Sequence, residues 1–170
     1  MTAEEAFDRY HEAVFRFIYR MTRRVDVAED ITQDCFLAFV RGPERYDQTR
    51  GTVKTYLFSI ARNLALKRYH SHRAEVPLEL NEISPPGDRR QGLEISAAVE
   101  QALTGLPPLQ QEALILFEYE GCTLQEIAGI TGADAGTIKS RLHRARERLK
   151  KVLAPYREVF VGTAREPGSE

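Results

Sequence analysis

The chain has 170 residues, and its 24 lysines and arginines nearly balance 25 aspartates and glutamates, for a formal net charge of −1 at pH 7. Apolar residues make up 42% and charged residues 29%, a composition typical of globular proteins and unlike disordered or fibrous ones. The sequence lacks the roughly 20-residue apolar run that crosses a bilayer, and it begins with an acidic segment unlike a signal peptide. We therefore expect a cytoplasmic protein with no membrane insertion, built as one domain or two small ones.

The residue types that support catalysis or metal binding form no recognisable site. Cys35 and Cys122 lack CxxC spacing and lie in apolar settings, which favours two buried thiols. His70 and His72 lie in a basic, polar stretch without a cysteine or carboxylate partner, so a solvated or phosphate-facing pair is favoured over a metal pair. Because no catalytic triad order or glycine-rich phosphate loop appears either, we predict no enzyme, no metal and no cofactor.

Residues 1–72 have the apolar spacing of three helices, and no segment shows the alternation of a half-buried strand. Thr2 and Glu5 form a predicted capping box for the first helix, while Asp26 and Thr52 are expected to cap the second and third. The core positions expected in the three helices are, in order, Phe7, Tyr10, Val14, Phe17, Ile18 and Met21; Ala28, Ile31, Cys35, Ala38 and Phe39; and Val53, Leu57, Ile60 and Leu64.

A second helical unit follows a stretch in which the spacing fails. Residues 73–92 contain prolines and glycines among mostly acidic side chains, a pattern typical of a flexible linker. Helical spacing resumes over 93–155, where glycines and prolines separate further helices, one of them expected over 109–119. Residues 156–170 have the composition of a disordered tail. The sequence therefore predicts an all-α protein of two small domains joined by a linker.

The segment TLQEIAGITGADAGTIKSRLHRARERLKK has the pattern of a helix-turn-helix. Thr123 and Glu126 form a predicted capping box for a short helix that ends at Gly132, and Asp134 is expected to cap a long one. The core stripe of the long helix would consist of Ile138, Leu142, Ala145, Leu149 and Val152. In this motif the N-terminal turns of the second helix enter the major groove of DNA.

Outside its core stripe, the long helix carries side chains suited to DNA. The residues expected to face bases are Thr137, Lys139, Ser140, His143 and Arg144. Further cations extend the positive surface toward phosphates, namely Arg141, Arg146, Arg148, Lys150 and Lys151. The capping box, the turn glycine and the one-sided charge together favour DNA binding over the alternative of a solvated basic face.

A second basic stretch, QTRGTVKTYLFSIARNLALKRYHSHR, contains no acidic residue. One strip of its helix combines an aromatic ring, a hydroxyl, an amide and a cation, on Tyr56, Ser59, Asn63 and Lys67. Other cations in this stretch include Arg50, Lys54 and Arg62. Stacking surfaces, polar donors and cations are what single-stranded or partly melted nucleic acid needs. The alternative, that Tyr56 faces the core and the cations only solubilise the helix, stays open at this point.

The second helix carries an acidic surface formed by Glu29, Asp30, Gln33 and Asp34. These side chains are expected on an open helix face with no predicted cleft. A docking surface for a basic partner, or a solvated face, is therefore favoured over acid–base catalysis. The near-neutral total charge thus conceals one acidic and two basic regions.

Three segments together resemble a known family. DVAEDITQDCFLAFV, RYDQTRGTVKTYLFSIARNLALKRYH and LPPLQQEALILFEYEGCTLQEIAGITGADAGTIKSRLHRARERLKKVL are similar to domains two and four of extracytoplasmic-function (ECF) sigma factors, in that order and with a linker between them. The resemblance covers nearly the whole chain apart from the linker and the tail. It implies a dissociable subunit of bacterial RNA polymerase that directs promoter recognition.

The resemblance also implies roles for individual residues. The acidic surface matches the helix that contacts the clamp of the largest polymerase subunit, and domain four is expected to contact the flap of the second-largest subunit. Asn63 matches a base-contacting residue for the −10 element, and Tyr46 matches a loop aromatic that lines a pocket for a flipped-out base. The positions that match base readers of the −35 element are Lys139, Ser140, His143 and Arg144. An anti-sigma factor is an expected partner.

The chain departs from the family at Tyr56, where many members carry tryptophan, and it contains no tryptophan at all. We predict a two-domain sigma factor that reads the −10 and −35 elements and helps to melt DNA. A self-sufficient helix-turn-helix repressor or activator, whose first domain senses a ligand or dimerises, would share part of this pattern. So would an adaptor that uses only the acidic surface to bind proteins. Binding to core polymerase distinguishes the sigma factor from the regulator, and the adaptor predicts no DNA-dependent activity.

Overall fold

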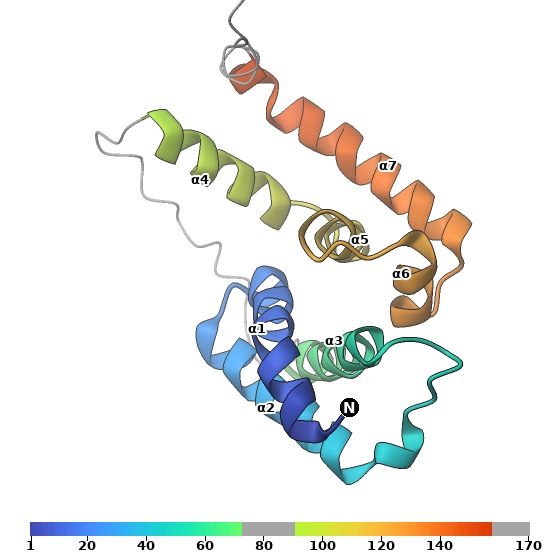
Figure 1. Cartoon of the computed structure of the whole chain (residues 1–170). Coiled ribbons are helices and arrows are strands. Elements are labelled where there is room, and N and C mark those ends of the chain that lie inside the picture. The colour runs from blue at the N-terminus through green and yellow to red at the C-terminus, as the bar shows by residue number, and fades with distance from the viewer. Residues whose placement is uncertain (73–90, 158–170) are drawn as a thin grey trace, which may run out of the picture.

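The computed structural model describes residues 1–72 and 91–157, and within them every regular element is helical. The helices form two groups along the chain (Figure 1). The first group consists of α1 (Ala3–Thr22), α2 (Val25–Arg41) and α3 (Val53–His72). The second consists of α4 (Gln91–Thr104), α5 (Pro108–Leu114), α6 (Leu124–Thr131) and α7 (Ala135–Val152). The predicted all-α fold of two small domains is confirmed, and none of the described helices is long and apolar enough to span a membrane.

The first group is one three-helix unit. Phe17 of α1 and Phe58 of α3 are fully buried and meet edge to face, with ring centroids 5.3 Å apart. Such aromatic pairs add about 0.5–1.5 kcal/mol beyond the burial of their area. The Cys35 thiol of α2 donates to the Leu57 carbonyl of α3 at 3.3 Å. These contacts join all three helices around one core.

Two predicted helix starts in this group are confirmed. The Thr2 hydroxyl accepts from the Glu5 backbone N–H at 3.1 Å, while the Glu5 carboxylate accepts from the Thr2 N–H at 2.7 Å. The Thr52 hydroxyl accepts from the Thr55 N–H at 3.2 Å at the start of α3. Each bond satisfies a backbone donor that the first turn of a helix leaves without an intrahelical partner.

The predicted cap of the second helix is wrong. α2 already begins at Val25, so Asp26 lies inside its first turn. The Asp26 carboxylate binds the Arg24 guanidinium at 2.7 Å, because the arginine offers a charged partner just outside the helix. A carboxylate in the first turn still interacts favourably with the helix dipole.

Three residues expected in the core are exposed. Phe7 is 44% exposed, because it lies at the rim of the α1 and α2 contact, where its ring stacks on His11. Ala38 is exposed because the buried stripe of α2 runs along a neighbouring face, through Cys35. Val152 is 57% exposed at the last turn of α7, beyond the part of that helix which packs on the core.

The helix predicted over residues 109–119 is α-helical only in its first part. α5 continues into a π-helical turn, Ile115–Tyr119, in which Ile115 and Leu116 are buried. The chain then turns at Gly121, whose φ of +66° favours glycine. π turns are rare and are frequently found at functional sites. Here the turn directly precedes Glu120, whose carboxylate faces α1.

The predicted helix-turn-helix is present. The Thr123 hydroxyl accepts from the Glu126 N–H at 3.1 Å and the Glu126 carboxylate accepts from the Thr123 N–H at 3.1 Å. α6 ends at Gly132, with a φ of +76°, and the Asp134 carboxylate caps α7 by accepting from the Thr137 N–H at 2.7 Å. This hydrogen bond lowers the pKa of Asp134. The two helices pack through the buried side chains of Ile127, Ile130, Ile138, Leu142 and Ala145.

The two groups are in contact in this structure. α3 lies against α6, and α1 lies against α5 and the π turn (Figure 1). α4 begins at Gln91, slightly earlier than the sequence indicated. The rest of the predicted linker, and most of the predicted tail, lie outside the described residues.

Candidate nucleic-acid interface

The exposed side of α7 carries the predicted recognition residues. The side chains of Lys139, Ser140, His143, Arg144 and Arg148 are exposed, while those of Thr137 and Arg141 are half-buried. The opposite side of the helix is buried in the domain core, as the helical period requires. Among the described residues, no acidic group forms an ion pair with Lys139, Arg144 or Arg148. These cations are therefore available to an external polyanion.

Arg146 has a different setting on the same helix. Its guanidinium pairs with Glu118 at 2.8 Å and lies 5.3 Å from the centroid of the Phe117 ring. Both charged side chains remain about half exposed, and such surface pairs typically contribute at most about 1 kcal/mol. Arg146 therefore links α7 to the π turn and is already partnered before any DNA arrives.

A pocket of about 360 Å³ lies at the N-terminal half of α3. It brings together four of the residues predicted to face the −10 element, Tyr46, Arg50, Tyr56 and Ser59. Its volume falls within the range of about 300–1,000 Å³ usual for ligand sites. The second domain also contributes to the wall of this pocket, through Gln125, Glu126 and Gly129 of α6.

Tyr46 and Tyr56 organise this pocket. The Tyr46 hydroxyl donates to the Gly51 carbonyl at 3.1 Å, which closes the loop between α2 and α3. The two tyrosine rings lie 5.4 Å apart, and both also pack near Phe39 of the core. Tyr56 is half-buried, so it contributes to the core edge and also lines the pocket. Tyr56 thus makes a core contact and also keeps an accessible edge, and its contact with nucleic acid stays a prediction.

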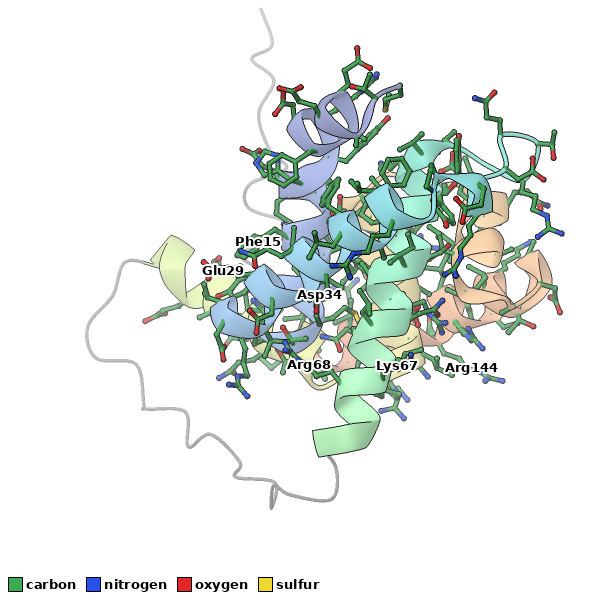
Figure 2. All side chains as sticks on the ribbon, turned by 90° about the horizontal axis from the view of Figure 1, so that it is seen from below. Phe15, Glu29, Asp34, Lys67, Arg68 and Arg144 are labelled. Atoms are coloured by element: carbon green, nitrogen blue, oxygen red, sulfur yellow. The ribbon has the colours of Figure 1, made fainter. Side chains whose placement is uncertain are left out.

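Asn63 and Lys67 lie further along α3 and do not line the pocket. Both side chains are exposed. Figure 2 shows Lys67 and Arg68 on opposite sides of α3, with Arg68 toward α2. Arg68 pairs with Asp30 of α2 at 3.1 Å. The predicted strip is therefore continuous along α3 but only its first half belongs to the pocket.

Lys54 and Arg62 face the second domain. The Lys54 ammonium donates to the Glu120 carbonyl at 2.6 Å. Arg62 forms an ion pair with Glu112 of α5, in which the side chains are 14% and 4% exposed, respectively. These two cations thus have partners within the chain, unlike Lys139, Arg144 and Arg148 of α7.

The acidic surface of α2 is open to solvent. Glu29, Asp30, Gln33 and Asp34 are all exposed. Glu29 and Asp34 are labelled on α2 in Figure 2, where the first domain lies in front of the second. The acidic surface is therefore accessible while the two domains are in contact.

The structure also bears on the cysteines and histidines. Burial raises the pKa of the Cys35 thiol to about 12 and that of the Cys122 thiol to about 11. Both therefore stay protonated near neutral pH, as expected for buried apolar thiols. Among the described residues, no cluster of three or more His, Cys, Asp or Glu side chains could hold a metal ion. The side chains of His70 and His72 lie outside the described ones.

Comparison with known proteins decides the family. A model of sigma-70 region 2 matches residues 6–75, and a model of sigma-70 region 4 matches residues 96–149. The chain is 32% identical over 152 residues to the ECF RNA polymerase sigma factor SigM of Mycobacterium tuberculosis, covering 88% of this chain and 76% of SigM. The chain belongs to the ECF sigma factors. The sigma factor is also 30% identical over 158 residues to SigM of Bacillus subtilis, with 88% and 94% of the two chains covered.

A solved structure agrees with this assignment. The sigma factor resembles RpoE from Bartonella quintana, which was solved in complex with the anti-sigma factor NepR, at a TM-score of 0.70 and 29% identity. The match covers 89% of this chain and 96% of RpoE. The first helical group therefore corresponds to sigma domain two, and the second to sigma domain four.

Sequence reasoning missed the carboxylates that join the two domains of this sigma factor. Glu112 lies among the buried residues of α5, and Glu120 follows the π turn. An acid within an otherwise apolar helix face, as in LQQEALILF, indicates a buried charge that needs a cation. The pattern of one helix does not reveal which distant cation it meets.

Proposed function

We propose that this ECF sigma factor reads the −35 element with α7, reads and helps to melt the −10 element with α3 and the Tyr46 loop, and binds core polymerase through the acidic surface of α2. The exposure of the cations of α7 on a capped helix-turn-helix is the observation that carries the proposal. ECF sigma factors direct promoter-specific initiation by RNA polymerase, and this chain has both of the domains required.

For the −35 element, α7 offers side chains of suitable chemistry on its first turns. Lys139 and Arg144 can donate to guanine, and Ser140 and His143 can bond other base edges. Arg148, further along the helix, is placed to neutralise a phosphate rather than to read a base. The buried side of α7 fixes the orientation of these groups before DNA arrives.

For the −10 element, the pocket beside α3 is suited to an unstacked base. Tyr46 and Tyr56 supply aromatic surface, Ser59 supplies a polar group and Arg50 supplies charge. Flipping a base costs a few kcal/mol of stacking, which a pocket repays only for a base that fits. Asn63, exposed beyond the pocket, would contact a neighbouring base and add specificity.

The mechanism is bipartite binding without catalytic chemistry. Two weak DNA contacts and the polymerase contacts lie on one chain, so each raises the effective concentration of the others. The partners are the clamp of the largest polymerase subunit, the flap of the second-largest subunit, and promoter DNA in the cytoplasm. We include an anti-sigma factor among the partners, supported by the complex formed by the similar RpoE.

Initiation by core polymerase tests the whole proposal. Purified sigma factor is added to core enzyme with a library of promoter fragments, and transcripts are mapped. Promoter-specific transcripts that require the chain are expected. Tight binding of the chain to operator DNA, without any binding to core polymerase, would instead identify a self-sufficient regulator.

Charge reversal tests the docking surface. Asp30→Arg combined with Asp34→Arg should abolish binding to core polymerase, because both exposed carboxylates would be replaced by cations. A matched control reverses Glu4 and Asp8, which are exposed on α1 with the same spacing. Binding is measured by size-exclusion chromatography, and helical content by circular dichroism. Unchanged binding by a folded double variant would remove the acidic surface from the proposal.

A further inference from the structure

We propose that the Tyr46 loop, residues 46–52, holds two successive unstacked nucleotides of the promoter, one on each side, and that Gln48 selects adenine in the second position. The inference deepens the proposed function and rests on it, because the first nucleotide is the base proposed for the pocket beside α3. It adds a second pocket, on the side of the loop that faces α1, and a residue that reads the base there.

The second pocket has a volume of about 510 Å³ and lies where the loop approaches the start of α1 (Figure 1). The residues that line this pocket and not the one beside α3 are Met1, Tyr10, Gln48, Thr49 and Val53. Those that line both pockets are Tyr46, Arg50, Gly51 and Thr52. Two pockets that share a wall suit two successive nucleotides of one strand, because each base can then occupy a binding surface of its own.

The second pocket offers aromatic surface without negative charge. Tyr10 of α1 and Tyr46 of the loop are both half-buried, so each ring packs on the core and keeps an accessible part. The Arg9 guanidinium lies 5.6 Å from the centroid of the Tyr10 ring, which places a cation beside it. Among the described residues that line this pocket, none carries a carboxylate. An unstacked base can therefore stack on these rings while its phosphate meets positive rather than negative charge.

A tight turn presents Gln48 to the second pocket. The Arg50 N–H donates to the Asp47 carbonyl at 3.0 Å, and the Asp47 carboxylate accepts from the Thr49 N–H at 2.9 Å and from the Thr49 hydroxyl at 2.7 Å. The hydrogen bonds from Thr49 lower the pKa of Asp47, so this carboxylate stays ionised and the turn stays closed near neutral pH. The Gln48 side chain is exposed, and no hydrogen bond within the described part of the chain uses its amide.

A free glutamine amide favours adenine. It can donate to N7 and accept from the N6 amino group of that base, whereas guanine presents acceptors at both of those positions. A single strand exposes these edges once the base has left the stack. The Thr49 hydroxyl already donates to Asp47, so Gln48 offers the free donor and acceptor of the loop. Gln48 is therefore the residue expected to set the base preference of the second pocket.

Arg50 is placed to bind the phosphate between the two nucleotides. It lines both pockets, and its side chain is 88% exposed. Its partner is Asp47 at 3.8 Å, and an ion pair so exposed contributes little. A phosphate can replace that carboxylate through two parallel hydrogen bonds from the guanidinium. One cation between two base pockets thus matches two nucleotides and the phosphate that joins them.

Base-by-base substitution of the −10 element tests the inference. Core polymerase carrying the wild-type or a variant sigma factor binds a fluorescent forked DNA whose −10 element is single-stranded on the non-template strand, and affinities for all four bases are compared at every position. Gln48→Ala should lower the preference for adenine about tenfold at one position, the usual scale of a base contact. Ser59→Ala, in the pocket beside α3, should lower discrimination at the adjacent position. Unchanged preferences in Gln48→Ala would overturn the inference.

The geometry also predicts an order along the strand. Asn63 lies on α3 beyond the pocket that contains Ser59, whereas Gln48 lies on the α1 side of the loop. The positions that respond to Asn63→Ala, Ser59→Ala and Gln48→Ala should therefore follow one another in that order. An effect of Gln48→Ala at the position read through Ser59 would place both residues at one base and overturn the second pocket.

An abasic nucleotide and a matched control make the test specific. On DNA without a base at the responding position, the wild-type and Gln48→Ala proteins should bind equally, because the amide has no base to contact; a persisting difference would overturn base reading by Gln48. Gln101→Ala removes an exposed glutamine of α4 and should leave every −10 preference unchanged. Circular dichroism checks that each variant keeps its helical content.

The wild-type protein separates this inference from the proposed function. If the wild-type protein with core polymerase showed no base preference at any −10 position, the proposed reading of the −10 element would be rejected. If the wild-type preferences were present and Gln48→Ala left them all intact, only the second pocket would be rejected. Promoter-specific initiation would then still support the proposed function.

Discussion

The two basic helices α3 and α7 each carry several cations beside a buried apolar stripe. The partners of these cations differ between the two helices. Lys54 and Arg62 of α3 contact domain four of the same chain. Lys139 and Arg144 of α7 are exposed, and no acid among the described residues pairs with them. A count of basic residues therefore predicts where a polyanion could bind, but not whether the site is free in the isolated chain.

The largest expected effect concerns the cores that support the two helices. Leu57→Ala in α3 and Leu142→Ala in α7 each remove a buried side chain and should cost about 2–5 kcal/mol. If the two domains have separate cores, each variant should unfold its own domain first in urea. Labelling of Cys35 then reports unfolding of domain two, and labelling of Cys122 that of domain four. Equal labelling of both thiols in both variants would show that the two domains unfold together. The two helices could then not be compared as parts of separate domains.

Base-contacting residues should give the next largest effect. Asn63→Ala should weaken discrimination at the −10 element, and Arg144→Ala at the −35 element, by about 1–3 kcal/mol each. The Arg144 effect should appear in duplex binding by the free chain, because that side chain is exposed on the helix-turn-helix, whereas the Asn63 effect should require core polymerase, because the −10 element must first be melted. Competition assays with single-base promoter variants measure both. Equal losses on every variant would argue against base reading.

A smaller effect distinguishes paired from unpaired cations within α7. Arg148→Ala should weaken duplex binding uniformly and lower the slope of log affinity against log salt by about 1. Arg146→Ala should lower the slope less, because that guanidinium is already paired with Glu118. Fluorescence anisotropy over a range of KCl concentrations gives both slopes. Equal slopes for the two variants would mean that the pairing in the free chain has no consequence for DNA.

The smallest effect concerns thiol reactivity at mildly alkaline pH. Burial raises the pKa of Cys35 to about 12 and of Cys122 to about 11, so little thiolate exists at a pH near 8. The folded protein should therefore react slowly with iodoacetamide, with the rate increasing as the pH rises toward these values. Mass spectrometry of the labelled peptides measures each thiol. Rapid labelling of either cysteine without unfolding would contradict its burial.

Local signals predicted much of this fold because each depends on neighbouring residues. The capping boxes of Thr2 and Thr123 and the Asp134 cap involve bonds between residues three apart. The Asp26 cap was wrong because Arg24 competed for the same carboxylate. The exposed faces of α2 and α7 followed from helical periodicity, and the family resemblance supplied their expected partners.

Contacts between the domains could not be predicted in the same way. Arg62 and Glu112 are far apart in the sequence, and their pairing depends on how two complete domains meet. The π turn also escaped prediction, since its apolar residues suit a regular helix equally well. The π turn positions Glu120 for an ion pair with Arg20, and only the structure shows that α1 faces this residue.

The buried pair of Arg62 and Glu112 has a consequence for how single substitutions act on this sigma factor. The Glu112 side chain is 4% exposed, so replacing Arg62 by an uncharged residue leaves a carboxylate without its cation where water barely reaches it. The effect of an Arg62 substitution on promoter recognition therefore combines any lost DNA contact with a change inside the free chain. Replacing both residues by uncharged ones removes both charges together, and comparison of the single and double variants separates the two contributions.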